Sequence, residues 1–416
     1  MDKIHNMAPP PMHIYDNRNI NVSRRFVKSY AGFPRNSSGN FPEMRLSCTI
    51  DGGITGKDMV MDSGERVLTA LHCGVPDRVP VNYFANPGID GRLKRHFGLE
   101  ASDNEGLLLA LGVDFRRVEP PYRGPKLHPD YPERGVISDC WGNRMRKVEH
   151  GSGCYWDFCE FPLAEAGPEE VAAWPMPSPD DFDYSGIAEQ CRRWRSFAVC
   201  VGDPGTADVI NSSGRVRGME QTLIDFALDE PAGTLLAERR AEIQLEVLRR
   251  TIEAAKGGID FLWMGEDLGT QIAPLISMET FRRHLKPLHQ RFIDLAASFG
   301  LPVMAHCCGS SSWVFDEWIG MGVKAVDTLQ PEAANMAPEY LKRRFGGRLA
   351  FHGCISTAGA LSFGSVEEVR KVCRDTLDIM MPGGGYCFAP THLIQDNSPL
   401  ENVLEMYRCA REFGRC

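Results

Sequence analysis

Eight short apolar runs divide the chain between residues 79 and 390, and stretches of helical periodicity separate most of them. Because the runs are continuously apolar rather than alternating, each predicts a strand that is buried on both faces of a parallel sheet. Strands alternating with helices predict an α/β protein, and eight of them predict a (β/α)8 TIM barrel. The predicted strands are 79–84, 113–118, 197–201, 261–264, 303–306, 325–329, 349–352 and 386–390.

The segments after the later runs have the apolar spacing of amphipathic helices. A further helical region covers residues 220–256 and is broken at Asp229-Glu230-Pro231, where Pro231 suits a first helical turn. The other predicted helices are 278–299, 311–320, 338–345, 365–381 and 399–413.

Two segments do not fit the alternating pattern. Residues 1–60 are rich in Pro, Asn, Ser and Gly and predict an irregular N-terminal extension, which a start codon assigned too early or an arm packed on a partner subunit would explain. The barrel domain is expected over residues 61–416, with Ser63 as the cap of its first helix. Residues 121–160 follow the second strand and contain turn signals, so we expect a hairpin-like insertion over one barrel mouth.

Charge and composition exclude several kinds of partner. The net charge is -9, which argues against nucleic acid, because binding to its phosphates needs clustered basic residues. There is no leader-like segment and no run of eighteen apolar residues, so we expect a cytoplasmic protein without a membrane partner. Thiols stay reduced in the cytoplasm, and the 14 cysteines are therefore expected to pack in the core, react or bind metal. A homodimer is compatible with this composition.

The carboxyl ends of the strands carry the chemistry of a barrel enzyme. The fourth to eighth runs end in "WMGEDLGTQ", "MAHCCG", "VDTLQPE", "FHGCIST" and "APTHLIQDNSP". Residues two apart in a strand share a face, so His306 and Cys308 project together while Cys307 points away and is expected to pack in the core.

His306 and Cys308 predict a zinc site. A catalytic zinc ion needs three protein ligands, and either His392 or Cys354 would supply the third. The alternative is a pocket in which the same side chains pack without metal. Glu266 and Asp267 are the candidate catalytic residues, as general base, ligand or partner of a ligand, although acids here could also only cap a helix. Substrate binding is assigned to five other residues: Asn82, Tyr83, Gln330, His352 and Gln395.

From residue 61 onward the chain resembles the uroporphyrinogen decarboxylase superfamily, whose members include the methylcobamide:coenzyme M methyltransferases. The segments that carry the resemblance are "SGERVLTALHCGVPDRVPV", "GIDFLWMGEDLGTQIAPLISMETFRRHLKP", "VMAHCCGSS", "AVDTLQPEA", "LAFHGCIST" and "GGGYCFAPTHLIQDNSPLENVLEMY". The resemblance implies a TIM barrel with its pocket at the carboxyl-terminal mouth.

The same resemblance favours the methyltransferase branch. After the first strand this chain has "NYFANPGIDGRLKRHFG" in place of the "RQAGRY" type segment with which the decarboxylase binds carboxylates. His306 and Cys308 match the first two ligands of the methyltransferase zinc site, and His392 stands where that branch has a third cysteine. The resemblance thus implies Zn²⁺ on His306, Cys308 and His392, with Cys354 as the fallback ligand.

We therefore expect an enzyme that uses zinc to activate a thiol acceptor and takes a methyl group from a corrinoid carried by a separate protein. The first alternative is a cofactor-free decarboxylase acting on a polycarboxylate, which would resist chelators. The second is a subunit without catalytic activity that binds within a larger complex.

Overall fold

The computed structural model describes residues 60–151 and 153–416. The predicted extension over residues 1–60 falls almost entirely outside the described residues, so it and the domain boundary that it sets stay predictions.

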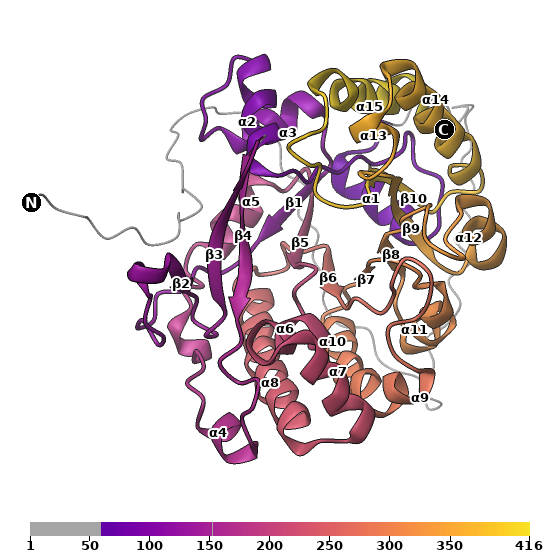
Figure 1. Ribbon diagram of the computed structural model, residues 1–416. Helices are drawn as coiled ribbons and strands as arrows, with labels where there is room; N and C mark the ends of the chain where they lie inside the picture. Colours follow the sequence, from indigo (N-terminus) through magenta and orange to yellow (C-terminus); the bar gives the residue numbers. More distant parts are fainter. Residues whose placement is uncertain (1–59, 152) are drawn as a thin grey trace, which may run out of the picture. The chain divides into compact units, whose positions relative to one another are not determined.

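Seven parallel strands form the central sheet, in the order β1-β5-β6-β7-β8-β9-β10 (Figure 1). Nearly every strand residue is buried, because helices cover the outer face and apolar side chains fill the inside. The strands are β1 (Phe115–Val118), β5 (Ala198–Gly202), β6 (Phe261–Gly265), β7 (Val303–Cys307), β8 (Ala325–Thr328), β9 (Ala350–Ile355) and β10 (Tyr386–Pro390). The predicted TIM-barrel fold is confirmed.

Residues 79–85 occupy the eighth strand position without forming a regular strand. Val81 pairs in parallel with Phe388 of β10, and its carbonyl accepts the N–H of Asp114, directly before β1, at 2.9 Å. Pro80 has no N–H to donate, so a continuous ladder cannot form there. The segment still joins β10 to β1 and closes the ring of strands.

Helices surround the sheet in Figure 1. The predicted helix over residues 278–299 is present as α9, a π-helical turn (Phe281–Leu285) and α10. The predicted cap of α1 is wrong: Asp62 is the cap, while the Ser63 hydroxyl donates to Asp114 at 2.6 Å. The helices are α1 (Ser63–Leu71), α2 (Pro87–His96), α3 (Asn104–Leu111), α4 (Pro168–Ala173), α5 (Ile187–Arg193), α6 (Val209–Arg217), α7 (Met219–Leu228), α8 (Pro231–Ala254), α9 (Met278–Thr280), α10 (Lys286–Ser298), α11 (Phe315–Met321), α12 (Pro338–Phe345), α13 (Ala360–Phe363), α14 (Val366–Met380) and α15 (Leu400–Phe413).

The expected insertion is an antiparallel sheet of three strands, β2 (Val136–Ser138), β3 (Arg144–His150) and β4 (Gly153–Glu160). One end of β4 lies against Asp396 in the loop after β10, and its other end places Phe158 5.0 Å from the Arg215 guanidinium of α6. The hairpin therefore spans one side of the carboxyl-terminal mouth. No helix among the described residues combines the length and the apolar character needed to cross a membrane.

Candidate metal centre at the carboxyl end of the barrel

The register of the sheet places three polar side chains side by side. His306 on β7 is paired with Asp327 on β8, and Asp327 is paired with His352 on β9. Paired residues on adjacent parallel strands project to the same face, so the three side chains lie in one row near the strand ends.

His306 is held by its Nδ1 atom and presents its Nε2 atom to two other groups. Nδ1 lies 2.7 Å from Asp327 Oδ2 and 2.7 Å from Thr328 Oγ1. Nε2 lies 3.4 Å from Cys308 Sγ and 3.8 Å from Asp267 Oδ1. A carboxylate on Nδ1 favours the tautomer whose Nε2 carries a free lone pair, which is the arrangement of a metal-binding histidine.

Asp267 and Cys308 complete a compact cluster with His306. Asp267 Oδ1 accepts the backbone N–H of Cys308 at 2.8 Å, and Oδ2 accepts from the Asn211 side chain of α6 at 2.9 Å. One potential ligand atom from each of the three residues lies within 4.8 Å of the others. The neighbouring thiol, Cys307, is 1% exposed and points into the core, as strand parity predicts.

The electrostatics of this cluster favour a positive charge between its members. Burial lowers the pKa of His306, but the hydrogen bonds to Asp327 and Cys308 outweigh burial and raise that pKa well above its usual value. Burial raises the pKa of Asp267, but the charge of His306 and the hydrogen bond from Cys308 bring it below its ordinary value. A divalent cation would compete with the His306 proton for the same position.

The cluster does not contain either predicted third ligand. His392 lies in the loop after β10, where desolvation and, after it, the charge of His306 lower its pKa. Cys354 is buried inside β9, and burial raises the pKa of its thiol. Among the described residues, Asp267 is the side chain that joins His306 and Cys308, and ligation by His392 or Cys354 stays a prediction.

Glu266 points away from this cluster. Its two carboxylate oxygens accept the backbone N–H groups of Val209 and Ile210 at the start of α6, at 2.8 and 3.0 Å, and His289 Nε2 lies 3.1 Å away. Burial raises the pKa of Glu266 to about 8. These contacts anchor α6; a catalytic role for Glu266 stays a prediction.

Two residues predicted to bind substrate extend the row behind His306. His352 Nδ1 lies 2.5 Å from Asp327 Oδ1, and its Nε2 lies 3.1 Å from the Asn82 side-chain nitrogen. Both side chains are buried; His352 contacts Asp327, Asn82 contacts His352, and substrate binding by either residue stays a prediction.

The other three residues predicted to bind substrate each contact a different residue, and substrate binding by them stays a prediction. Gln330 Oε1 accepts the N–H of Gly309, next to Cys308, at 2.7 Å. Tyr83 donates to Asp90, and Gln395 accepts from Asn86. Of these three, Gln330 is the one that contacts a residue adjacent in sequence to the cluster of Asp267, His306 and Cys308.

Three residues that contact the cluster were not among the site residues predicted from the sequence: Asp327, Thr328 and Asn211. Asp327 had a signal, because it lies in a predicted strand between two predicted strands that end in His306 and His352. Thr328 has a φ of +87°, a conformation rarely adopted by a β-branched residue, and it brings a hydroxyl to His306. Asn211 comes from a helix whose distance from the cluster no sequence pattern gives.

The fold and the cluster define a TIM-barrel protein with a metal-competent site at its carboxyl-terminal mouth. Residues 207–413 match the family model for uroporphyrinogen decarboxylase (URO-D), a segment that contains Asp267, His306, Cys308 and Asp327. The expected resemblance to the uroporphyrinogen decarboxylase superfamily is confirmed over this segment.

One solved structure with a similar fold is a methyltransferase from Methanosarcina mazei. The two chains are 19% identical, the TM-score is 0.56, and the similarity covers 85% of this chain and 99% of the other. A search of curated proteins found no match.

Proposed function

We propose that this protein is a zinc-dependent methyltransferase that activates a thiol acceptor and takes its methyl group from a corrinoid on a separate protein. The observation that carries the proposal is the convergence of His306 Nε2, Cys308 Sγ and a carboxylate oxygen of Asp267 at the barrel mouth. The match to the family model and the fold shared with a methyltransferase support it.

The donor set fits zinc. Imidazole nitrogen, thiolate sulfur and carboxylate oxygen are all zinc ligands, whereas Mg²⁺ and Ca²⁺ prefer oxygen alone. His306 is oriented through Nδ1 by Asp327, as zinc-binding histidines commonly are. Three protein ligands leave a fourth position for substrate, which a catalytic zinc site requires.

The carboxylate of Asp267 also contributes a negative charge to the proposed ligand set. His392 stands where the methyltransferase branch has a cysteine, so the ligand set predicted from that resemblance has one thiolate fewer. Asp267 in the third position restores one negative charge. The ligands His306, Cys308 and Asp267 then balance the two positive charges of zinc.

Zinc, when bound, lowers the pKa of a coordinated thiol and so supplies a thiolate at neutral pH. His306, Cys308 and Asp267 would hold the ion, and Asp327 would keep His306 Nε2 directed at it. The sulfur of the acceptor thiolate would form the new bond to the methyl carbon. The bond between that carbon and the corrinoid metal would break, and both of its electrons would stay on the corrinoid.

The test is thiol methylation with free methylcobalamin as donor, before and after removal of metal by a chelator. We expect activity to be lost with the metal and restored by zinc. His306→Ala and Cys308→Ala should abolish it, whereas Cys307→Ala, the matched control on the neighbouring thiol, should keep it. Chelator-resistant decarboxylation of a polycarboxylate without thiol methylation would refute the proposal.

A further inference from the structure

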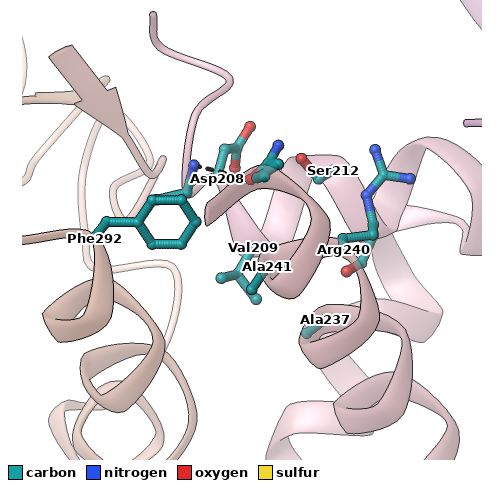
Figure 2. A pocket seen from close by; sticks show the side chains of 10 residues that line it. Asp208, Val209, Ser212, Ala237, Arg240, Ala241 and Phe292 are labelled. Carbon is teal, nitrogen blue, oxygen red and sulfur yellow. Dashed lines mark hydrogen bonds between the residues drawn. The ribbon is translucent and has the colours of Figure 1, made fainter. Parts of the chain in front are cut away.

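A small cavity lies among the outer helices α6, α8 and α10 (Figure 2). Asp208 and Val209 at the start of α6 line it together with Arg240 of α8, and none of the three metal-competent residues reaches it. The cavity has room for about one water molecule, so it offers no second site to a substrate. The backbone that departs most from ordinary geometry beside the metal-competent cluster lies elsewhere, at the carboxyl end of β8.

The end of β8 is strained. Thr328 is 1% exposed and has a φ of +87°, and Leu329, which follows it, has a φ of +50°. A positive φ is unfavourable for most residues other than glycine, and especially for a β-branched residue such as threonine. The end of β8 is therefore held in a conformation that its own residues disfavour.

The neighbouring strand accommodates this conformation. Thr328 is paired with Gly353 on β9, and a Cβ atom at Gly353 would lie 2.2 Å from the Thr328 carbonyl oxygen. Gly353 itself has a φ of +117°, which glycine adopts without the penalty that other residues meet. Any other side chain at position 353 would displace Thr328, so the strain is maintained by two strands together.

In this conformation Thr328 contacts both residues of the pair that orients the metal-competent imidazole. Its backbone N–H donates to Asp327 Oδ1 at 2.6 Å, and its hydroxyl oxygen lies 2.7 Å from His306 Nδ1. Asp327 Oδ2 lies 2.7 Å from the same nitrogen. In the tautomer that a carboxylate on Nδ1 favours, the Nδ1–H of His306 has the carboxylate and the hydroxyl as its two acceptors.

Two acceptors restrict the imidazole more than one does. A single hydrogen bond lets a ring pivot about it, whereas contacts to two different residues also fix the plane of the ring. The direction of His306 Nε2, which lies 3.4 Å from Cys308 Sγ, follows from that plane. A functional group needs to be held within about 0.5 Å of its productive position, and supporting hydrogen bonds do this.

We propose that Thr328 is a positioning residue for the zinc site, an inference that rests on the proposed function. Its strained backbone sets its hydroxyl against His306 Nδ1, and the hydroxyl fixes the direction of Nε2. Thr328 does not touch the metal or the substrate. The alternative is that Thr328 only fills space, in which case its hydroxyl is dispensable.

Three substitutions separate the hydroxyl from the strain. Thr328→Ser keeps the hydroxyl, Thr328→Ala removes it, and Thr328→Gly also removes the Cβ atom that disfavours a positive φ. In competition for zinc against a chelator of known affinity, Thr328→Ser should match the wild type, whereas Thr328→Ala and Thr328→Gly should bind zinc about 10-fold more weakly. In zinc-free protein, Thr328→Gly should have a higher Tm than Thr328→Ala, because glycine adopts this backbone conformation without strain.

The orientation of His306 can be read without metal, in zinc-free crystals. Thr328→Ser should keep the ring as it is, and Thr328→Ala should show it turned or in more than one orientation; Thr328→Gly gives the same readout if Thr328→Ala does not fold. Equal zinc affinities of Thr328→Ser and Thr328→Ala, an unchanged ring in the variants without the hydroxyl, or a lower Tm in Thr328→Gly than in Thr328→Ala would overturn the proposal.

The two proposals fail in different ways. A wild-type protein that binds no zinc refutes the proposed function, and the orientation of His306 in the zinc-free crystals then decides the role of Thr328 by itself. Zinc bound equally well by the wild type and by Thr328→Ala leaves the proposed function intact and refutes the role of Thr328.

Discussion

At the scale of single residues, the site depends on how each side chain of the cluster is held. Asp327 accepts from two histidines, and its position in the sheet is fixed because His306, Asp327 and His352 are in register. Glu266 and Asp267 are adjacent acids with different contacts. Glu266 anchors α6, whereas Asp267 faces the mouth. We therefore expect activity to depend on Asp267, His306, Cys308 and Asp327.

Asp327→Asn should weaken zinc binding by about 10- to 100-fold, because an amide orients His306 less well and adds no negative charge behind it. The measurement is competition for zinc against a chelator of known affinity, with circular dichroism to verify folding. Asp316→Asn, an exposed acid paired with Arg344, is the matched control and should leave affinity unchanged. Unchanged affinity in Asp327→Asn would show that Asp327 does not orient a zinc ligand.

At the scale of elements, an ion-pair network ties α1 to the closure of the barrel. Arg66 of α1 donates to Asp77 at 2.7 Å and to Asp114, directly before β1, at 2.8 Å. Arg66 and Asp114 are almost fully buried. Asp114 keeps its ion pair with Arg78 at 2.8 Å, so Arg66→Met removes hydrogen bonds to two carboxylates without leaving Asp114 unpaired. It should destabilise the fold by about 1 to 3 kcal/mol, as measured by urea unfolding.

The same network gives a dependence of stability on pH. Burial alone would raise the pKa of Asp77, but its hydrogen bond and ion pair with Arg66 hold that pKa below the ordinary value of 3.8. A lowered folded-state pKa means that this stabilisation is complete above about pH 4 and is lost as the pH falls through the folded value. Urea unfolding from pH 6 to pH 2 should therefore show a smaller loss in Arg66→Met than in the wild type. Equal slopes would contradict this.

Elements were predictable from the sequence where a buried apolar run was continuous. Runs such as 386–390 became strands with the same limits, because burial on both faces selects apolar residues at every position. The segment 79–84 differs, since Pro80 interrupts the hydrogen bonds that define a strand. Parity also gave His306 and Cys308 on one face, because both belong to or directly follow β7.

The rest of the site could not be read from periodicity. Asp267 and His392 lie in loops beyond the strand ends, where no repeating pattern fixes the direction of a side chain. The sequence therefore supported Asp267 only as one of two acids, and it favoured His392 through resemblance alone. The position of Asp327 could have been predicted, since aligning the strand ends places it between His306 and His352.

At the scale of the whole molecule, stability depends on the apolar interior that the closed ring of strands encloses. Phe261 on β6 is fully buried and packs edge-on against Phe115 of β1. Phe261→Ala should lower the free energy of unfolding by about 3 to 5 kcal/mol, because it leaves a cavity that a closed barrel cannot collapse to fill. Urea unfolding measures this, and Leu228→Ala, 67% exposed, should change stability by less than about 0.5 kcal/mol. A small effect of Phe261→Ala would mean that the interior repacks.

The barrel also explains why residues from distant parts of the chain form one site. Asn211, Asp267, His306 and Asp327 come from α6, from the loop after β6, and from β7 and β8, which a parallel barrel brings to the same mouth. The match to the URO-D family covers this half of the chain. The β3–β4 hairpin belongs to the other half and spans one side of the mouth.

The central claim is that His306, Cys308 and Asp267 hold a zinc ion. Anomalous scattering at the zinc absorption edge, from crystals of protein purified without chelator, tests it most directly. The account predicts one zinc per chain in contact with His306 Nε2, Cys308 Sγ and an Asp267 oxygen. No zinc at this mouth, or zinc bound without His306 and Cys308, would contradict it; zinc on His392 or Cys354 instead of Asp267 would contradict the third ligand.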